Sequence, residues 1–176
     1  MRVFRVIFAI ILIIFVIISS IFVFSFKTAY KDIVVLEAQN NQLQPALVFS
    51  IIKAESKFNC GAKSSAGAVG LMQIKLDTAN YILKLNGEEK INESDLLNPA
   101  INIKIGTLYL RYLQNKFENL DVVICAYNAG ETVVRNWLEN IELSKDGKTL
   151  IYVPFKETKT YLKKVKFNLL IYSKIL

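Results

Sequence analysis

The feature that most restricts the folding of this chain is an uncharged, apolar run near its N-terminus. Residues 6–26 contain no Asp, Glu, Lys or Arg. As a helix this run would rise about 31 Å, close to the thickness of the hydrocarbon core of a bilayer. A cleaved secretory signal is the competing interpretation, but its apolar region usually has roughly 7–15 residues and ends at a small-x-small site, which the residues around Lys27 do not provide. The run therefore predicts a transmembrane signal anchor within residues 1–26.

The charges on either side of this run bear on its orientation. Arg2 and Arg5 precede it, and the positive-inside rule places such a short basic head in the cytoplasm. Lys27 and Lys31 follow the run and weaken this preference. We expect residue 27 onward to lie on the extracytoplasmic side of a cell membrane, with residues 27–42 as a stalk or short helix and residues 43–176 as one compact domain.

The composition of this chain of 176 residues excludes several classes of catalytic and metal chemistry. It contains no His, which excludes Ser-His-Asp and Cys-His nucleophile pairs and His-ligated metal centres. Its two cysteines, Cys60 and Cys125, are too few for a structural zinc site, so we expect neither a metal nor a cofactor. In an exported domain the two thiols can pair as a disulfide. Two semi-buried thiols that never meet are an equally good interpretation.

The net charge of the chain is +7, and most of it lies beyond the apolar run, because residues 1–26 hold only two of the 22 basic residues and none of the 15 acidic ones. A mildly basic exported domain is attracted to anionic lipid head groups or wall polymers by a screened, non-specific force. The lysines are dispersed and no recognition motif for nucleic acid is present, so no nucleic-acid partner is expected. The densest group, Lys163, Lys164 and Lys166, is typical of the solvated face of a terminal helix.

Helical spacing of apolar residues recurs along the exported part. Pro45 and the Asn98–Pro99 pair are typical helix starts, and Gly130 is a typical stop. The Gly-rich stretch 59–70 is expected to form turns. These patterns predict a mainly α domain with short extended pieces at most. Helices are expected over residues 45–58, 76–85, 98–112, 120–130, 131–141 and 157–176.

An acidic residue interrupts the apolar face of the first of these helices. On a helical wheel Glu55 falls in the middle of the cluster formed by Val48, Ile51 and Ile52. Burying an unpaired carboxylate costs several kcal/mol, so such a group usually protonates or finds a partner. Glu55 thus has the features of an acid kept neutral near pH 7. A structural carboxyl group with a hydrogen-bond partner is the alternative that the pattern leaves open.

Five short sequence strings indicate which family of proteins this chain resembles. They are AESKFN at 54–59, SSAGAVGLMQI at 64–74, NPAINIKIGTLYL at 98–110, AYNAGETVVRNWL at 126–138 and PFKETKTYLKKV at 154–165. In this order they resemble the lytic transglycosylase domains of the soluble-transglycosylase (SLT) type, which are similar to goose-type lysozyme. The resemblance covers roughly residues 42–170 and implies a mainly α, lysozyme-like α+β fold.

The resemblance also implies roles for the residues that match. Glu55 is implied to be the single catalytic acid and base, and Tyr127 is expected to hydrogen-bond Glu55 or the acetamido group of the substrate. Lys75 stands where the family often has Met-Pro, and we expect it to pair with a carboxylate of a peptide stem. The residues implied to contact substrate are Ser64, Gln73, Lys75, Tyr127 and Glu157, and the supporting residues are Ser56 and Asn128.

The activity implied by the resemblance is cleavage of the β-1,4 bond between N-acetylmuramic acid and N-acetylglucosamine in peptidoglycan, with formation of 1,6-anhydromuramoyl ends. The implied partners are peptidoglycan glycan strands and, through the N-terminal run, the membrane; a protein partner in an envelope apparatus is left open. Three alternatives also stay open. They are a hydrolytic muramidase of the same fold, a non-catalytic glycan-binding scaffold module, and a small anchored helical protein without a ligand.

Overall fold

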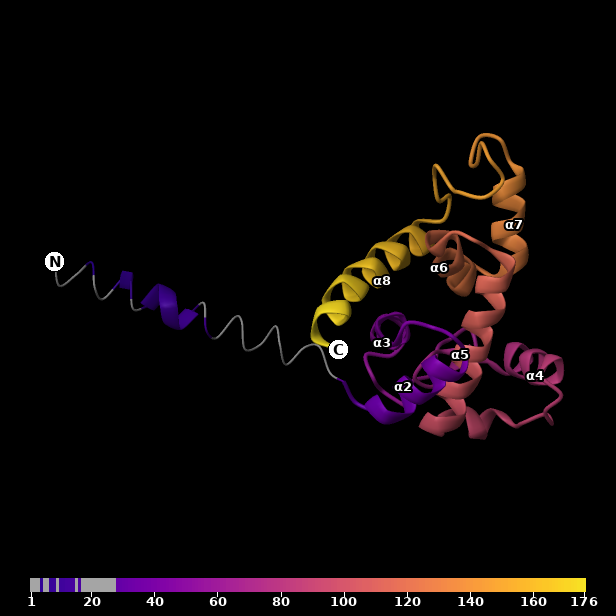
Figure 1. Cartoon of the computed structure of the whole chain (residues 1–176), viewed down its shortest axis with the longest axis horizontal. Helices are drawn as coiled ribbons and strands as arrows, with labels where there is room; N and C mark the ends of the chain where they lie inside the picture. Colours follow the sequence, from indigo (N-terminus) through magenta and orange to yellow (C-terminus); the bar gives the residue numbers. More distant parts are fainter. Residues whose placement is uncertain (1–3, 5–6, 9, 15, 17–27) are drawn as a thin grey trace.

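The computed structural model describes residues 4, 7–8, 10–14, 16 and 28–176 (Figure 1). Among these residues, none of the helices combines the length and the apolar character needed to cross a bilayer. The predicted transmembrane run over residues 6–26 lies mainly outside the described residues, so the anchor stays a prediction. Residues 28–176 form the packed body, which is mainly helical, as the sequence predicts.

Helix α3, Pro45–Glu55, lies at the centre of this body. Pro45 begins it because proline has no amide hydrogen to lose and a backbone angle that already suits a helix. Residues 46–52 are all buried, as expected for a helix that is apolar on almost every side. Helix α8, Lys156–Ile175, covers α3 along its length. The ring of Tyr172 on α8 stacks on Phe49 of α3, with 5.3 Å between the ring centroids.

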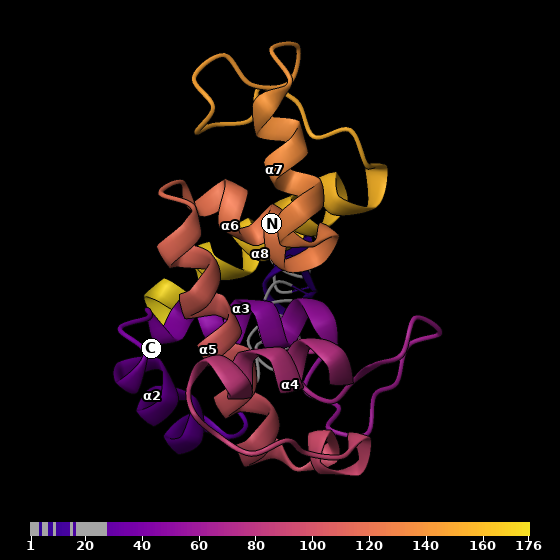
Figure 2. The same ribbon diagram turned by 90° about the vertical axis from the view of Figure 1, so that its right-hand side faces the viewer.

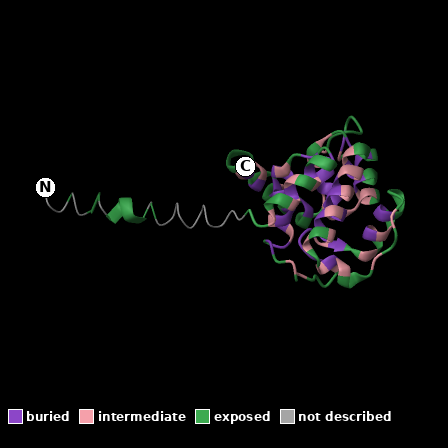
Figure 3. Cartoon of the chain, turned by 60° about the horizontal axis from the view of Figure 1, so that its bottom comes forward, coloured by how far each residue is buried: buried purple, intermediate pink, exposed green. Residues whose placement is uncertain are grey.

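The other helices surround this pair. They are α2 (Lys31–Asn40), α4 (Leu76–Leu85), α5 (Pro99–Lys116), α6 (Leu120–Ala129) and α7 (Glu131–Glu139). Figure 2 shows α4 toward one end of the body and α7 at the other, with α5 between them. Asn98 and Asn119 cap α5 and α6, because their side-chain oxygens accept hydrogen bonds from amides of the first turn. Buried residues gather where the helices meet (Figure 3).

Part of the expected stalk or short helix is packed into this body. Residues 31–40 form α2, and its Val34 and Ala38 are fully buried in the core formed with α3 and α5. The amide of Leu43 donates to the carbonyl of Ala38 at 2.8 Å, which turns the chain from α2 toward α3. Helix α2 therefore belongs to the folded body.

The Gly-rich stretch forms turns, as expected, and leads into a short antiparallel hairpin of β1 (Ala68–Val69) and β2 (Ile74–Lys75). Gly70, between the two strands, has a φ of +80°. A Cβ atom at this position would collide with the Asn102 side chain and the Leu96 carbonyl. Only glycine suits both the left-handed backbone and the close approach of α5.

The buried side-chain amide of Asn102, on α5, holds the hairpin in place. The Asn102 side chain accepts a hydrogen bond from the Met72 amide at 2.8 Å and donates to the carbonyls of Val69 at 2.9 Å and Leu96 at 2.8 Å. Leu96 belongs to a 3-10 helix, η1 (Glu93–Leu97). Asn102 therefore ties the hairpin and η1 to the core at one point.

We expect Asn102→Ala to lower the free energy of unfolding by several kcal/mol. The substitution leaves the Met72 amide and two carbonyls without their partner, and each buried group without a hydrogen bond costs about 1–3 kcal/mol. Urea unfolding monitored by circular dichroism measures the change, and Asn115→Ala, at an exposed position of α5, is the control. A loss no larger than that of Asn115→Ala would contradict this account of the hairpin.

Candidate active site

A cleft of about 570 Å³ opens beside the C-terminal end of α3. Its walls come from that helix end, the loop and hairpin after it, α4, α5, the end of α6 and the beginning of α8. The residues that line it are Glu55, Ser64, Ser65, Ala66, Ala68, Gln73, Ile74, Lys75, Thr78, Tyr109, Tyr127, Asn128, Ala129, Gly130 and Glu157. The lining thus combines hydroxyl, amide and charged groups with aromatic rings. This combination suits a polar ligand with apolar ring faces.

Glu55 is the last residue of α3 and is half-buried at the cleft. Burial is the main reason that the pKa of its carboxyl group rises from 4.5 to about 7, and the nearby Glu157 adds to the rise. Tyr161 and Lys164, both on α8, act in the opposite direction because they favour the ionised form. The direction of this shift agrees with the expectation that burial favours the neutral acid, and near pH 7 the protonated and ionised forms are comparably populated.

Tyr161 places a buried hydroxyl group beside Glu55. Its side chain is 8% exposed, and the hydroxyl makes no hydrogen bond of ordinary geometry to any described residue. Its proximity still lowers the pKa of Glu55, while burial and the neighbouring carboxyl group hold its own pKa well above the usual range. The hydroxyl is therefore a donor available to the ionised carboxylate.

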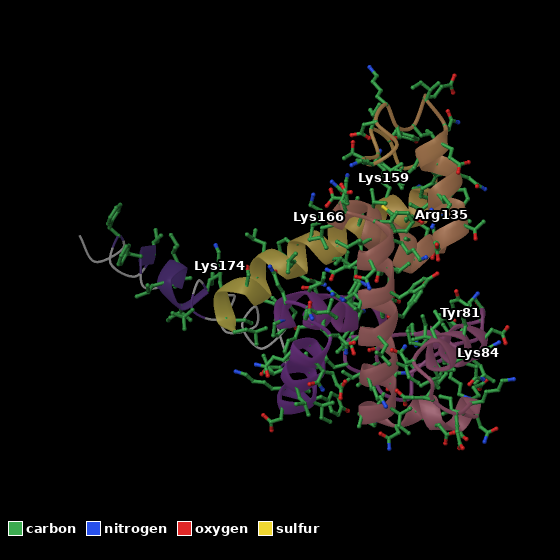
Figure 4. The ribbon with its side chains drawn as sticks, turned by 45° about the vertical axis from the view of Figure 1, so that its right-hand side comes forward. Tyr81, Lys84, Arg135, Lys159, Lys166 and Lys174 are labelled. Atoms are coloured by element: carbon green, nitrogen blue, oxygen red, sulfur yellow. The ribbon has the colours of Figure 1, made fainter. Side chains whose placement is uncertain are left out.

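Lys164 approaches the same carboxyl group from the next turn of α8. Its ammonium group donates a hydrogen bond to the carbonyl of Ala54, the residue before Glu55. Lys163, Lys164 and Lys166 are all exposed, as expected for the solvated face of a terminal helix. Lys164 has in addition a role that the sequence did not indicate, because the C-terminal carbonyls of α3 attract its cation. Lys166 pairs with Asp121 at 2.7 Å. Figure 4 shows Lys166 between Lys159 and Lys174 along α8.

Tyr127, on α6, is buried at the back of the cleft. Its hydroxyl donates a hydrogen bond to the carbonyl of Met72 at 2.9 Å, and its ring packs on Tyr109 with 5.2 Å between centroids. The predicted hydrogen bond from Tyr127 to Glu55 is not formed, because the single hydroxyl proton is directed at Met72. The oxygen can still accept a hydrogen bond, so a protonated Glu55 or an amide of the ligand suits it.

Gln73 and Ser64 line the cleft while they hold the loop together. Gln73 has a φ of +48°, unusual for a residue with a side chain, and its amide nitrogen donates to the carbonyls of Ala62 at 3.1 Å and Gly70 at 2.9 Å. The Ser64 hydroxyl accepts a hydrogen bond from the amide of Ala68 at 3.0 Å. Both predicted site residues therefore lie at the cleft and also shape its wall.

The other predicted residues divide into two groups. Lys75, Asn128 and Glu157 line the cleft, and Asn128 accepts a hydrogen bond from Thr158 at 2.8 Å. Ser56 does not line it; its hydroxyl donates to the carbonyl of Ile52 at 3.2 Å and supports the end of α3. Its supporting role in the site stays a prediction.

Sequence reasoning missed Tyr109 on α5 and, on α8, Tyr161 and Lys164. The α8 pair lies four and seven residues after Glu157, a spacing that places all three side chains on one helix face. That spacing within the PFKETKTYLKKV string was the signal that could have revealed them. Tyr109 lies at the end of the NPAINIKIGTLYL string but carries no comparable signal.

A second cavity, of about 550 Å³, adjoins the cleft on the side of α8. It shares Glu55, Asn128 and Glu157 with the cleft. Its remaining lining residues are Ala54, Lys156, Thr160, Tyr161 and Lys164. Glu55 therefore borders two spaces.

The two cysteines are not bonded to each other. Cys125 is fully buried in α6, and burial raises the pKa of its thiol to about 12, whereas Cys60 is half-buried in the loop after α3. The sequence left open either a disulfide or two thiols that never meet, and the structure has two separate thiols.

Comparisons with known proteins agree with this arrangement. The family described as the transglycosylase SLT domain matches residues 33–149. The soluble lytic murein transglycosylase of Salmonella typhimurium is 36% identical over 143 residues, which are 80% of this chain and 22% of that protein. The membrane-bound lytic murein transglycosylase E of Buchnera aphidicola is 37% identical over 114 residues, 60% of this chain and 52% of that protein.

A solved structure shares the fold. The crystal structure of the 70 kDa soluble lytic transglycosylase from Escherichia coli superposes with a TM-score of 0.76 and 32% identity, covering 85% of this chain and 25% of the other. Fold and cleft together define a lysozyme-like helical domain. The chain belongs to the transglycosylase SLT domain family. It spans about a fifth of the length of the soluble Salmonella relative.

The raised pKa of Glu55 makes a prediction about stability. Between pH 4.5 and about 7 the unfolded chain has lost this proton and the folded chain retains it, so the free energy of unfolding falls as pH rises through this window. We expect Glu55→Gln to remove the penalty, so that the variant is more stable than the natural chain at pH 8 by about 1–3 kcal/mol and equally stable at pH 4. Urea unfolding at both pH values measures this difference. An equal difference at the two pH values would contradict a raised pKa.

Proposed function

We propose that this chain is a lytic murein transglycosylase that cleaves the β-1,4 bond between N-acetylmuramic acid and N-acetylglucosamine in peptidoglycan. The observation that carries the proposal is the carboxyl group of Glu55 at the cleft, with its pKa of about 7. Near neutral pH such a group is protonated often enough to act as an acid and ionised often enough to act as a base. Membership of the SLT domain family supports the same activity.

The proposed reaction uses Glu55 twice. Protonated Glu55 donates its proton to the glycosidic oxygen as the bond between that oxygen and C1 of the muramoyl residue breaks. The carboxylate then takes the proton of the C6 hydroxyl, whose oxygen closes onto C1 and forms the 1,6-anhydro product. No water is consumed. The acetamido oxygen of the substrate stabilises the positive charge at C1, as in other substrate-assisted exceptions to catalysis by two carboxylates.

The neighbours of Glu55 suit this alternation. Burial and Glu157 favour the protonated acid that the first step needs, whereas Tyr161 and Lys164 favour the carboxylate that the second step needs. The Tyr127 oxygen is an acceptor for Glu55 or for a substrate amide. Opposing influences on one carboxyl group keep its two forms close in free energy.

Residues farther along the cleft contact the rest of the substrate in this proposal. Gln73 and Ser64 present the loop to the sugar rings, and Asn128 supports the floor of the cleft. Lys75 is exposed at the rim, where its ammonium group can pair with a carboxylate of a peptide stem. Glu157 offers the opposite charge across the cleft.

We also propose that the N-terminal run anchors the enzyme in a membrane, with the domain on the extracytoplasmic side, where peptidoglycan lies. The uncharged run of residues 6–26 supports this proposal. The described apolar side chains in this region, including Phe4, Ile7 and Ile11, are exposed to the surroundings and not buried in protein, which suits contact with lipid. The Buchnera relative is named as membrane-bound.

Glu55→Gln is expected to reduce the release of anhydromuropeptides by at least about 100-fold, because the amide cannot donate or accept the transferred proton. Mass spectrometry of purified peptidoglycan after digestion by the full chain measures the products. Glu142→Gln, at an exposed position between α7 and α8, is the matched control and should retain natural rates. Natural rates from Glu55→Gln would refute the assignment, and products heavier by one water would identify a hydrolase.

Lys164→Met is expected to move the alkaline limb of the pH profile to higher pH. Activity on this limb falls as Glu55 ionises, and the Lys164 cation promotes that ionisation, so its loss keeps Glu55 protonated to higher pH. The other groups that face Glu55 are Glu157, Tyr161 and Tyr127, and they are unchanged in this variant. Lys163→Met, one residue earlier on α8, should leave the limb in place. A limb that stays fixed or moves to lower pH would contradict this role of Lys164.

A further inference from the structure

The outer face of α8 carries basic side chains along most of its length. One side of the helix packs on α3 and α6, and the opposite side is exposed. Residues 158–176 contain no Asp or Glu, and Glu157 is directed to the cleft. At helical spacing, the exposed residues of this outer face are Lys156, Lys159, Lys163, Lys166, Leu170 and Lys174 (Figure 4).

The protein neutralises little of the charge on this face. Lys166 pairs with Asp121 at 2.7 Å. Among the residues that the structure describes, the other four lysines of the face form no ion pair. The outer face of α8 therefore attracts a surface of negative charge.

Exposed apolar side chains occur among the lysines toward the C-terminal end of the helix. Leu170 is 55% exposed, and Ile175 and Leu176 are also exposed. Lysines alone suit any polyanion, whereas apolar side chains among them suit a surface with an apolar interior. An anionic bilayer has both properties, because its head groups attract ammonium groups and its acyl boundary accepts apolar side chains.

The C-terminal end of α8 lies on the side of the body at which α2 begins. Figure 1 shows these two helix ends on one side of the body and α4 on the other. Figure 4, from another angle, likewise places Lys174 far from Tyr81 and Lys84 of α4. A surface that meets the beginning of α2 therefore also faces the end of α8.

The link between the predicted anchor and the body is short. The apolar run ends at Phe26, and Tyr30 already packs against the core. The chain from residue 26 to residue 30 spans at most about 14 Å, even when fully extended. The head-group region on each side of a bilayer is about 5–8 Å thick. A body attached so closely to the hydrocarbon core places its nearest side chains among the head groups.

We propose that the body rests on an anionic membrane surface through the outer face of α8 near its C-terminal end. Leu170 lies at the acyl boundary in this arrangement, and Lys174 lies among the head groups. Glu157 is about 20 Å from Leu170 along the helix axis, so the cleft stays clear of the membrane. This inference rests on the proposed N-terminal anchor and is independent of the reaction at Glu55.

Quenching of tryptophan fluorescence by brominated lipid tests this contact. The full chain is reconstituted into vesicles of phosphatidylcholine and phosphatidylglycerol, with or without bromine on the upper part of the acyl chains. The natural chain has one tryptophan, Trp137, which is buried in α7. Leu170→Trp adds an indole ring at the proposed contact. Leu85→Trp adds one at an exposed position of α4 and is the matched control.

We expect brominated lipid to remove at least about half of the emission that Leu170→Trp adds, because side chains at the acyl boundary lie about 5–10 Å deep. Emission from Trp137 and from Leu85→Trp should stay unchanged. Unquenched emission from Leu170→Trp in chains that remain in the vesicles would overturn the inference and leave the anchor in place. Release of the natural chain by alkaline carbonate would refute the proposed anchor, and this inference with it.

Reversal of charge on the same face is a second test. Lys163→Glu combined with Lys174→Glu, in the Leu170→Trp chain, should lower the quenching at least about twofold, because anionic head groups repel the new carboxylates. Lys84→Glu combined with Lys90→Glu, at exposed positions outside α8, should leave the quenching unchanged. Circular dichroism checks that each variant is folded. Equal quenching in both pairs would contradict contact with an anionic surface.

An anionic wall polymer is the other surface that lysines can bind. Sedimentation of the full chain with isolated cell walls distinguishes it from the bilayer. Unquenched Leu170→Trp, together with weaker sedimentation of the Lys163→Glu and Lys174→Glu chain, would assign this face to the wall polymer and overturn the inference. Quenched Leu170→Trp with unchanged sedimentation supports contact with the membrane.

Discussion

The packing of α8 against α3 is the interaction on which the site depends. Helix α3 is buried over residues 46–52, so its position is fixed by apolar contact on nearly every side. The most extensive of these contacts is with α8. The last residue of the fixed helix is Glu55, and the covering helix carries Glu157, Tyr161 and Lys164. The two helices that close the core therefore also set the chemistry of the carboxyl group. Folding and function share one interface.

That arrangement carries a cost in stability. A half-buried carboxyl group with a raised pKa is less favourable in the folded chain above pH 4.5 than a neutral amide would be. Natural proteins commonly retain such unfavourable groups where activity needs them. The hydroxyl of Tyr161, buried without a hydrogen-bond partner among the described residues, is a second unfavourable group at the same place.

Much of this fold and part of the site could be predicted from the sequence. Pro45, the Asn98–Pro99 pair and Gly130 mark helix ends through local backbone chemistry, and the structure begins or ends helices there. Glu55 was identifiable because one residue broke an apolar face. The hydrogen bond from Tyr127 to Met72 was not predictable, since it joins residues 55 positions apart. The role of Lys164 escaped prediction because a lysine at helical spacing is usually solvated, and only tertiary structure brings it to a helix end.

The Met72 peptide has a consequence for how a ligand enters. Its amide donates to Asn102 on α5 and its carbonyl accepts from Tyr127 on α6, so two different helices hold one short backbone segment. A wall anchored in this way is held in place before any ligand arrives. Binding then requires little rearrangement of the groove. The affinity is therefore not lowered by the conformational entropy that a closing flap would lose on binding. Recognition by this domain is in that sense a matter of fit to a preformed surface.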